Sequence, residues 1–124
     1  MARVQFKTEY MFKASPSVIY LFLTQPTCLV RWFCDKVDNV GDKFTFSWEW
    51  ESEDATMLDD IEDELVTYQW DERPKEFLKF RIYKTDITSE TILEITDFCD
   101  DDESEDQQYI WDMYIKKFKI YCGG

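Results

Sequence analysis

The sequence contains no histidine, and only three glycines and three prolines occur among its 124 residues. A zinc site of the usual cysteine and histidine kind is therefore nearly excluded, because no two of the four cysteines have the CxxC spacing either. A nucleophilic cysteine most often takes its base from histidine, so that kind of catalysis has no support. We expect reduced, mostly packed thiols, as in a cytoplasmic protein.

Basic residues and long apolar runs are also scarce. The 14 lysines and arginines face 27 acids, which gives a net charge of -13 and a field that repels nucleic acid and anionic lipid. No apolar run approaches the roughly 20 residues that would cross a bilayer. The first residues alternate apolar and polar, unlike a secretory leader. The sequence thus predicts a cytoplasmic protein with no nucleic-acid partner and no membrane insertion.

Two stretches without basic residues, 51–64 and 97–106, hold 15 of the 27 acids. We expect them to be solvated loops, with a docking surface for a basic protein partner as the alternative. The second stretch also resembles part of a calcium-binding loop, through alternate side chains at positions 100, 102, 104 and 106. Calcium binding is disfavoured, because Glu105 and Trp111 stand where such a loop requires glycine and glutamate.

Aromatic residues are abundant, at 18% of the chain, within a hydrophobic content of 44%. This is enough apolar surface to build one folded core. Alternation of apolar and polar side chains predicts strands over residues 4–12, 36–40, 43–51, 55–61, 65–70, 77–84 and 91–96. The facing of the last strand is ambiguous, because Leu93 and Ile95 compete with Ile92 and Glu94 for the inner side.

Three helices are predicted. Ser15 and Pro16 form a helix start, and Pro26 ends this first short helix and begins a second one. Ser104 and Gln107 have the spacing of a capping box at the start of a long C-terminal helix, which Gly123 ends. Its buried stripe comprises Trp111, Tyr114, Ile115, Phe118 and Cys122.

The order of these elements predicts a single α+β domain over residues 1–124. Hairpin-length connections indicate an antiparallel sheet of six to seven strands, with two short helices after the first strand. One face of this sheet is rich in aromatic residues and needs a cover, which only the long C-terminal helix is large enough to supply. We therefore expect a curved sheet wrapped around that helix.

Three segments carry a resemblance to a known family. These are residues 12–20 (FKASPSVIY), residues 29–33 (LVRWF) and residues 40–48 (VGDKFTFSW). In this order they resemble the START-like (helix-grip, SRPBCC) superfamily, in the branch of the C-terminal domain of the activator of the heat-shock protein ATPase. The chain departs from that pattern at Asp42, where the family has a second glycine, and at Ile110, where it often has glycine.

The resemblance implies a helix-grip fold whose cavity, between the sheet and the last helix, often binds a small hydrophobic or aromatic molecule. The expected cavity residues are Phe44, Phe46, Trp48, Trp50, Tyr68, Trp70, Phe80, Trp111 and Tyr114. These rings either line such a cavity or fill the interior, and the sequence leaves both open. A chaperone-associated protein-interaction module that uses the acidic surface is the second function. A cyclase-like enzyme is the least favoured, and no cofactor, metal or catalytic residue is predicted.

Overall fold

The computed structural model describes residues 2–124. Its first strand, β1 (Arg3–Phe12), leads into two short helices, α1 (Pro16–Thr24) and α2 (Pro26–Trp32). Six further strands follow, β2 (Lys36–Val40), β3 (Lys43–Ser47), β4 (Ser52–Ile61), β5 (Leu65–Trp70), β6 (Phe77–Lys84) and β7 (Thr91–Asp100). The chain ends in a long helix, α3 (Ser104–Cys122). Over these residues, the helices are too short or too polar to cross a membrane.

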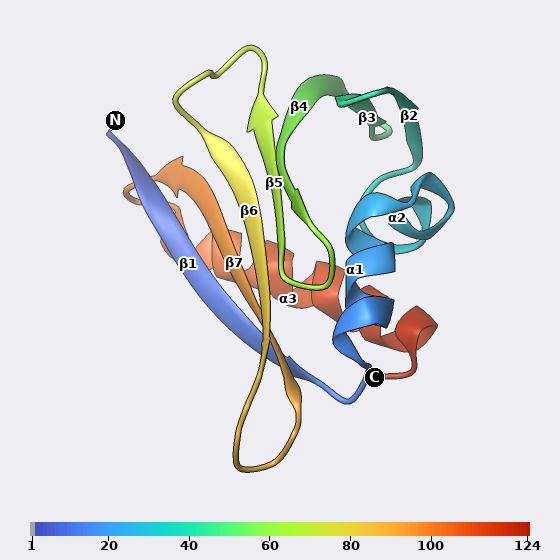
Figure 1. Cartoon of the computed structure of the whole chain (residues 1–124). Coiled ribbons are helices and arrows are strands. Elements are labelled where there is room, and N and C mark those ends of the chain that lie inside the picture. The colour runs from blue at the N-terminus through green and yellow to red at the C-terminus, as the bar shows by residue number, and fades with distance from the viewer. Residues whose placement is uncertain (1) are drawn as a thin grey trace.

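All seven strands form one antiparallel sheet in the order β1-β7-β6-β5-β4-β3-β2. β1 pairs with β7 along its whole length, from Arg3 opposite Asp100 to Phe12 opposite Thr91. The sheet curves around α3, which crosses one of its faces, while α1 and α2 lie beside the same end of that helix (Figure 1). The predicted α+β helix-grip architecture, with a seven-stranded sheet, is confirmed.

Local signals at the helix ends explain where most of them begin and end. Ser15 caps α1, because its hydroxyl oxygen accepts a hydrogen bond from the Val18 amide at 3.4 Å. Gly123 ends α3 with a φ of 90°, a left-handed conformation that favours glycine. The predicted capping box at the start of α3 is wrong, because the N-cap residue is Glu103, whose side chain makes no capping hydrogen bond, and Ser104 is already helical. Gln107 uses its side chain elsewhere, in a bond to Asp97.

Aromatic side chains from the sheet, from the two short helices and from α3 fill the centre of the molecule. From α3, Trp111, Ile115 and Phe118 are buried. The rings of Trp32 and Phe118 lie 4.7 Å apart between their centroids, and such separations are typical of packed aromatic pairs. Tyr68 is 1% exposed, and its hydroxyl group donates to the Leu23 carbonyl at 2.7 Å. The central space between the sheet and α3 is therefore a packed core.

The third strand is shorter than the sequence pattern predicts. β3 ends at Ser47, and the Trp48 amide then donates to the Glu51 carbonyl at 2.7 Å, which closes a tight connection to β4. Because the alternation of strand faces stops there, Trp50 does not point inward as predicted, and 72% of its surface is exposed. The inward prediction for Trp50 is wrong.

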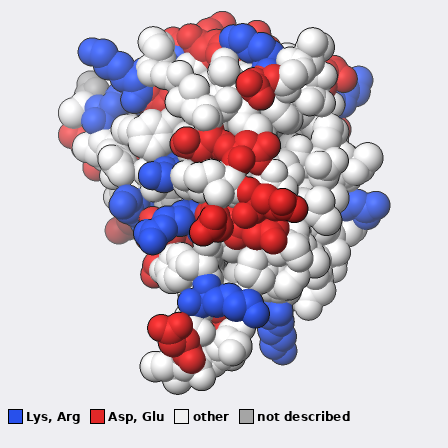
Figure 2. Space-filling model, in the orientation of Figure 1, with Lys and Arg blue, Asp and Glu red and all other residues white. Residues whose placement is uncertain are grey.

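The acidic stretches are less loop-like than predicted. β4 begins at Ser52 and takes in most of residues 51–64, and β7 continues to Asp100. β7 also resolves its ambiguous facing, since Leu93 and Ile95 are fully buried on the α3 side. Seen from the side away from α3, acidic side chains are interleaved with lysines and arginines rather than forming one continuous acidic face (Figure 2).

Candidate functional site

A pocket of about 270 Å³ opens at one end of the interface between the sheet and α3. Its walls come from the end of β7, the first turns of α3, the β3–β4 connection and the β5–β6 connection. Four of the five tryptophans line it: Trp48, Trp50, Trp70 and Trp111. The pocket therefore combines large aromatic surfaces with the charged ends of several elements.

Asp97 of β7 is the most enclosed carboxylate of this pocket. Its Oδ2 accepts hydrogen bonds from Gln107 Nε2 at 2.7 Å and from Trp111 Nε1 at 3.0 Å. Its Oδ1 accepts from the backbone amide of Phe98 at 2.8 Å. Burial raises the pKa of the Asp97 carboxyl above its ordinary value, and these three bonds oppose that rise. All three donors are neutral, and none of the ion pairs within residues 2–124 includes Asp97.

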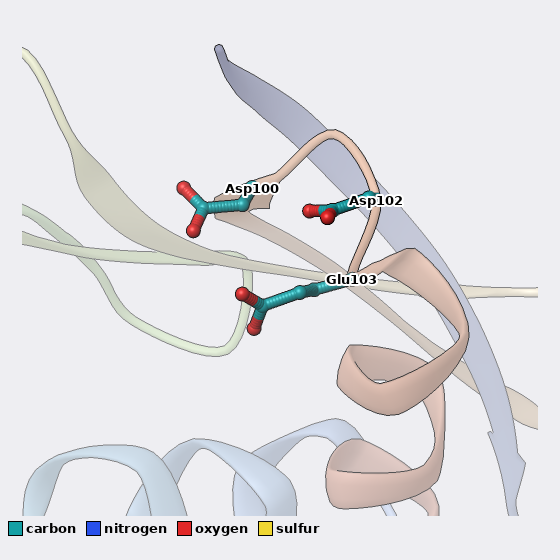
Figure 3. Close-up of side chains that lie close together, drawn as sticks. All are labelled: Asp100, Asp102 and Glu103. Atoms are coloured by element: carbon teal, nitrogen blue, oxygen red, sulfur yellow. The ribbon is translucent and has the colours of Figure 1, made fainter. Parts of the chain in front are cut away.

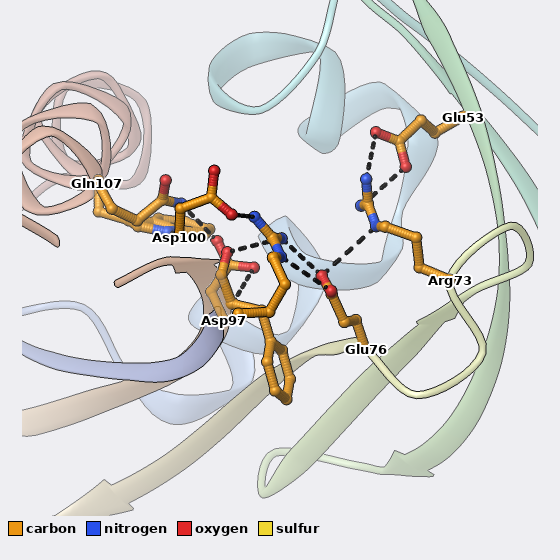
Figure 4. A network of polar contacts seen from close by, with 9 residues as sticks. Glu53, Arg73, Glu76, Asp97, Asp100 and Gln107 are labelled. Atoms are coloured by element: carbon orange, nitrogen blue, oxygen red, sulfur yellow. Dashed lines mark hydrogen bonds and ion pairs between the residues drawn. The ribbon is translucent and has the colours of Figure 1, made fainter. Parts of the chain in front are cut away.

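Two arginines at the rim of the pocket are shared among three acids. Arg3 binds Glu76 through two hydrogen bonds, of 3.0 and 2.7 Å, and its Nη1 lies 3.3 Å from Asp100. Arg73 lies between Glu53, at 3.0 Å, and Glu76, at 3.5 Å (Figure 4). Hydrogen bonding to Arg3 holds the pKa of the Glu76 carboxyl below its usual range. The positive charges of the rim are therefore already compensated by carboxylates.

The β3–β4 connection places one tryptophan firmly and leaves the other exposed. Trp48 donates from its indole nitrogen to the Phe33 carbonyl at 2.7 Å, and its ring packs edge-on against the Phe33 ring. Both Trp48 and Trp50 also line a second opening of about 190 Å³, together with residues of α2 and α3. Trp50 thus stands at the mouth of the first pocket, where a bound ring could pack against it.

The nine predicted cavity residues divide into two groups. Trp48, Trp50, Trp70, Trp111 and Tyr114 line the pocket, so the structure does bring these five together. The remaining four, Phe44, Phe46, Tyr68 and Phe80, lie in the packed core and do not line it. Ligand contact stays a prediction for the five residues that line the pocket. The other four pack in the core. The site is displaced from the middle of the sheet toward one end.

The sequence reasoning missed the polar residues of the pocket. Asp97 follows Leu93 and Ile95 at intervals of two, so extending the inner face of β7 by one more step would have found it. The spacing of Ser104 and Gln107 predicts a helix cap for Gln107 rather than a place in the pocket. Glu53 and Arg73 carry no local signal, because only the folded β4–β5 pairing brings them within 3.0 Å.

Three carboxylates gather in the turn between β7 and α3. Oxygens of Asp100, Asp102 and Glu103 lie within 4.8 Å of one another (Figure 3). Ser104 and Asp106, the other positions of the calcium-loop resemblance, are not part of this cluster. Asp100 is already paired with Arg3, and Glu103 is fully exposed, with its carboxyl pKa raised by the neighbouring Asp100. We assign no cation to this turn.

The outer face of α3 carries an apolar stripe. Exposed side chains recur at helical spacing along it, namely Tyr109, Ile110, Met113, Ile120 and Tyr121. The first three, with Lys117, line a shallow opening of about 210 Å³. Ile110 also reaches the rim of the tryptophan-lined pocket, so the stripe begins where that pocket opens.

Comparisons with known proteins agree on the type of domain. A family model described as a START-like superfamily domain matches residues 1–124. No curated protein sequence matches the chain. The Aha1 dimer from Colwellia psychrerythraea is similar in structure, with 19% sequence identity, a TM-score of 0.80 and coverage of 96% of each chain.

Two further solved structures are similar over nearly their whole length. A protein from Bacteroides fragilis is 27% identical, with a TM-score of 0.69, and the match covers 98% of this chain and 93% of that one. An AHSA1-like protein from Aeromonas hydrophila is 14% identical, with a TM-score of 0.73 and coverage of 95% and 91%.

Proposed function

The chain belongs to the START-like superfamily, and from this premise we propose that it is a binding module for a small hydrophobic or aromatic molecule. The ligand occupies the pocket at the end of the interface between the sheet and α3. The observation that carries the proposal is the gathering of Trp48, Trp50, Trp70 and Trp111 around one opening.

The size of the pocket limits the ligand. Its volume of about 270 Å³ is close to the lower end of the usual range for ligand pockets, about 300–1,000 Å³. A molecule of one or two rings fits this volume, whereas a long lipid chain does not. The packed core behind Trp111 closes the way to the middle of the sheet. The ligand therefore lies at one end of the interface between the sheet and α3, and it remains in contact with solvent through the mouth beside Trp50.

The exposure of Trp50 supports its role in binding. A tryptophan that is 72% exposed contributes little to folding, and a large ring at the mouth of a pocket is well placed to cover a bound aromatic molecule. Trp48 is held by its bond to the Phe33 carbonyl and supplies a fixed wall. The pair thus offers one rigid and one adjustable aromatic surface.

The proposal is tested by NMR with three one-ring probes that differ in charge, namely 2-phenylethylamine, 2-phenylethanol and 3-phenylpropionate. We expect at least one of them to shift the indole N–H signal of Trp111 and the side-chain amide signal of Gln107 in a saturable way. The variant Trp50→Ala should bind that probe at least about 5-fold more weakly.

The matched control is Ile87→Ala, in the β6–β7 connection at the opposite end of β7. Ile87 is 95% exposed and does not line the pocket, so its variant should bind like the unaltered protein. If none of the three probes moves the Trp111 and Gln107 signals, the binding proposal is wrong.

A second candidate function is protein interaction, favoured by the apolar stripe on α3. The similar Colwellia protein is a dimer, and a second copy of this chain could cover the same stripe. Ile120→Asp should then abolish self-association measured by sedimentation, and Val40→Asp, on β2, should not. Both side chains are exposed, so neither change is expected to disturb the fold. A monomer at all protein concentrations and salt concentrations would exclude this candidate.

A further inference from the structure

The charges around the tryptophan-lined pocket do not balance. Five carboxylates line it, against the two arginines of its rim, and the five are Glu51, Glu53, Asp97, Asp100 and Glu103. Both arginines are already paired with Glu53, Glu76 and Asp100. Among residues 2–124, Asp97, Glu51 and Glu103 have no cationic side chain within ion-pair distance. The empty space of the pocket therefore adjoins uncompensated negative charge.

The hydrogen bonds of Asp97 favour the ionised form, which attracts a cation, and oppose the rise in its pKa that burial causes. Three N–H groups point at its two oxygens, and donors of this kind stabilise the ionised carboxylate over the acid. Within residues 2–124, Oδ1 accepts a single hydrogen bond and keeps a lone pair for a further donor, and Asp97 is one of the residues that line the pocket. A largely buried carboxylate whose hydrogen-bond donors are all neutral is stabilised further by a partner that carries a full positive charge.

The aromatic walls of the pocket, like its carboxylates, favour a positively charged ligand. The faces of tryptophan rings attract cations through their negative quadrupole. One ring of this pocket already shows the effect, because the Arg73 guanidinium lies over Trp70, 5.4 Å from its ring centroid. Trp48, Trp50 and Trp111 offer further indole surface within the same opening.

We infer that the pocket selects aromatic amines, small aromatic molecules that carry an ammonium group, which pairs with Asp97 while the ring packs among the tryptophans. This inference rests on the proposed function and specifies its ligand class. An aromatic carboxylate is disfavoured in the same place, because its charge would face five acids. A neutral aromatic molecule keeps the ring contacts but leaves Asp97 uncompensated.

The test compares the affinities of the same three probes, which share one ring and differ in charge. Titrations are followed by the Trp111 indole N–H signal at pH 7 and about 0.15 M salt, where the general attraction of an acidic protein for cations is largely screened. We expect 2-phenylethylamine to bind at least about 10-fold more tightly than 2-phenylethanol, and 3-phenylpropionate to bind most weakly.

Three variants separate the contribution of the pocket carboxylates from the effect of the net charge of the protein. Glu51→Gln, at the pocket, should weaken binding of the amine about 3-fold without changing binding of the alcohol. Glu49→Gln removes the same charge from the same connection, but Glu49 lines the second opening and not this pocket, so it should leave both affinities unchanged. Asp97→Asn should reduce the preference for the amine over the alcohol further, to less than about 3-fold.

The outcomes distinguish this inference from the proposed function. If the alcohol or the carboxylate binds as tightly as the amine, the pocket is a binding site without cation selectivity, and the inference on ligand class is wrong. If Glu49→Gln and Glu51→Gln weaken the amine equally, the preference belongs to the net charge, and the inference is wrong again. If no probe binds, both proposals fall together. The probe ranking in the unaltered protein decides the matter even where Asp97→Asn does not fold.

Discussion

Trp111 Nε1 donates to Asp97 Oδ2 at 3.0 Å, so this hydrogen bond joins the buried face of α3 to the last strand, beside the one that Gln107 Nε2 of α3 donates to the same oxygen. The same carboxylate forms part of the wall of the candidate ligand pocket. A group placed there for binding is thus also part of the contact between helix and sheet. This double position makes the protonation of Asp97 relevant to both stability and ligand preference.

The stability of the protein should carry a pH dependence that arises from Asp97. Burial raises the pKa of this carboxyl in the folded state above its unfolded value, so protonation favours folding. The resulting stability is present below the unfolded pKa of about 3.9 and is lost as the pH rises through the folded pKa. In Asp97→Asn this contribution is absent. Urea denaturation between pH 4 and pH 7 should show the unaltered protein losing stability relative to the variant. Parallel curves for the two proteins would contradict this assignment.

Tyr68 should stabilise the contact between the sheet and α1 through its hydroxyl group. That group donates to the Leu23 carbonyl at 2.7 Å inside the core, and Tyr68→Phe leaves the carbonyl without this partner. We expect the free energy of unfolding to fall by about 1–2 kcal/mol. Tyr83→Phe is the matched control, because the Tyr83 hydroxyl donates to Glu9 at the surface. Its effect should stay within about 0.5 kcal/mol, and equal effects in urea denaturation would count against the role of Tyr68.

The two tryptophans of the β3–β4 connection should differ in their contribution to folding. Trp48 packs on Phe33 and Phe46 and donates to the Phe33 carbonyl, so Trp48→Ala should cost about 2–4 kcal/mol. Trp50→Ala removes an exposed ring and should cost less than about 0.5 kcal/mol. Chemical denaturation measures both. If Trp48→Ala leaves stability unchanged, Trp48 belongs to the pocket alone and not to the packed structure.

The sequence predicts the architecture well because the architecture depends on periodic patterns. The inner residues of β1, from Phe6 to Phe12, recur at intervals of two, and each end of α1 carries a proline or a capping serine that acts locally. Such signals need only neighbouring residues. Gly123 marks the end of α3 for the same reason, since its left-handed conformation is a local property.

The pocket is harder to predict because it forms where regular patterns end. Alternation predicts Trp50 on the inner face, but β3 ends at Ser47 and the rule does not apply beyond it. The pairing of Arg3 with Glu76 joins residues 73 positions apart, which composition and spacing do not reveal. Even the choice between a cavity and a packed core depends on how tightly the central rings meet, and no pattern encodes that distance.

The ion pairs at the rim should give stability a second pH dependence, of the opposite sign to that of Asp97. Arg3 lowers the pKa of Glu76 in the folded state, so this contribution is present above the unfolded pKa and is lost as the pH falls through the folded pKa. The Glu76 side chain is only 15% exposed and binds Arg3 through two hydrogen bonds. Glu76→Gln should therefore lower the free energy of unfolding by about 1 kcal/mol at pH 7.

The loss caused by Glu76→Gln should shrink as the pH is lowered toward 3, because the unaltered protein then loses the same ion pair by protonation. Asp71→Asn is the matched control. Asp71 pairs with Lys43 on the surface, where water and salt screen the interaction, so its replacement should change stability much less than Glu76→Gln does. Urea denaturation of the three proteins at pH 3, 5 and 7 makes the comparison. A Glu76→Gln curve that stays parallel to that of the unaltered protein down to pH 3 would show that Arg3 and Glu76 do not hold the rim together in solution.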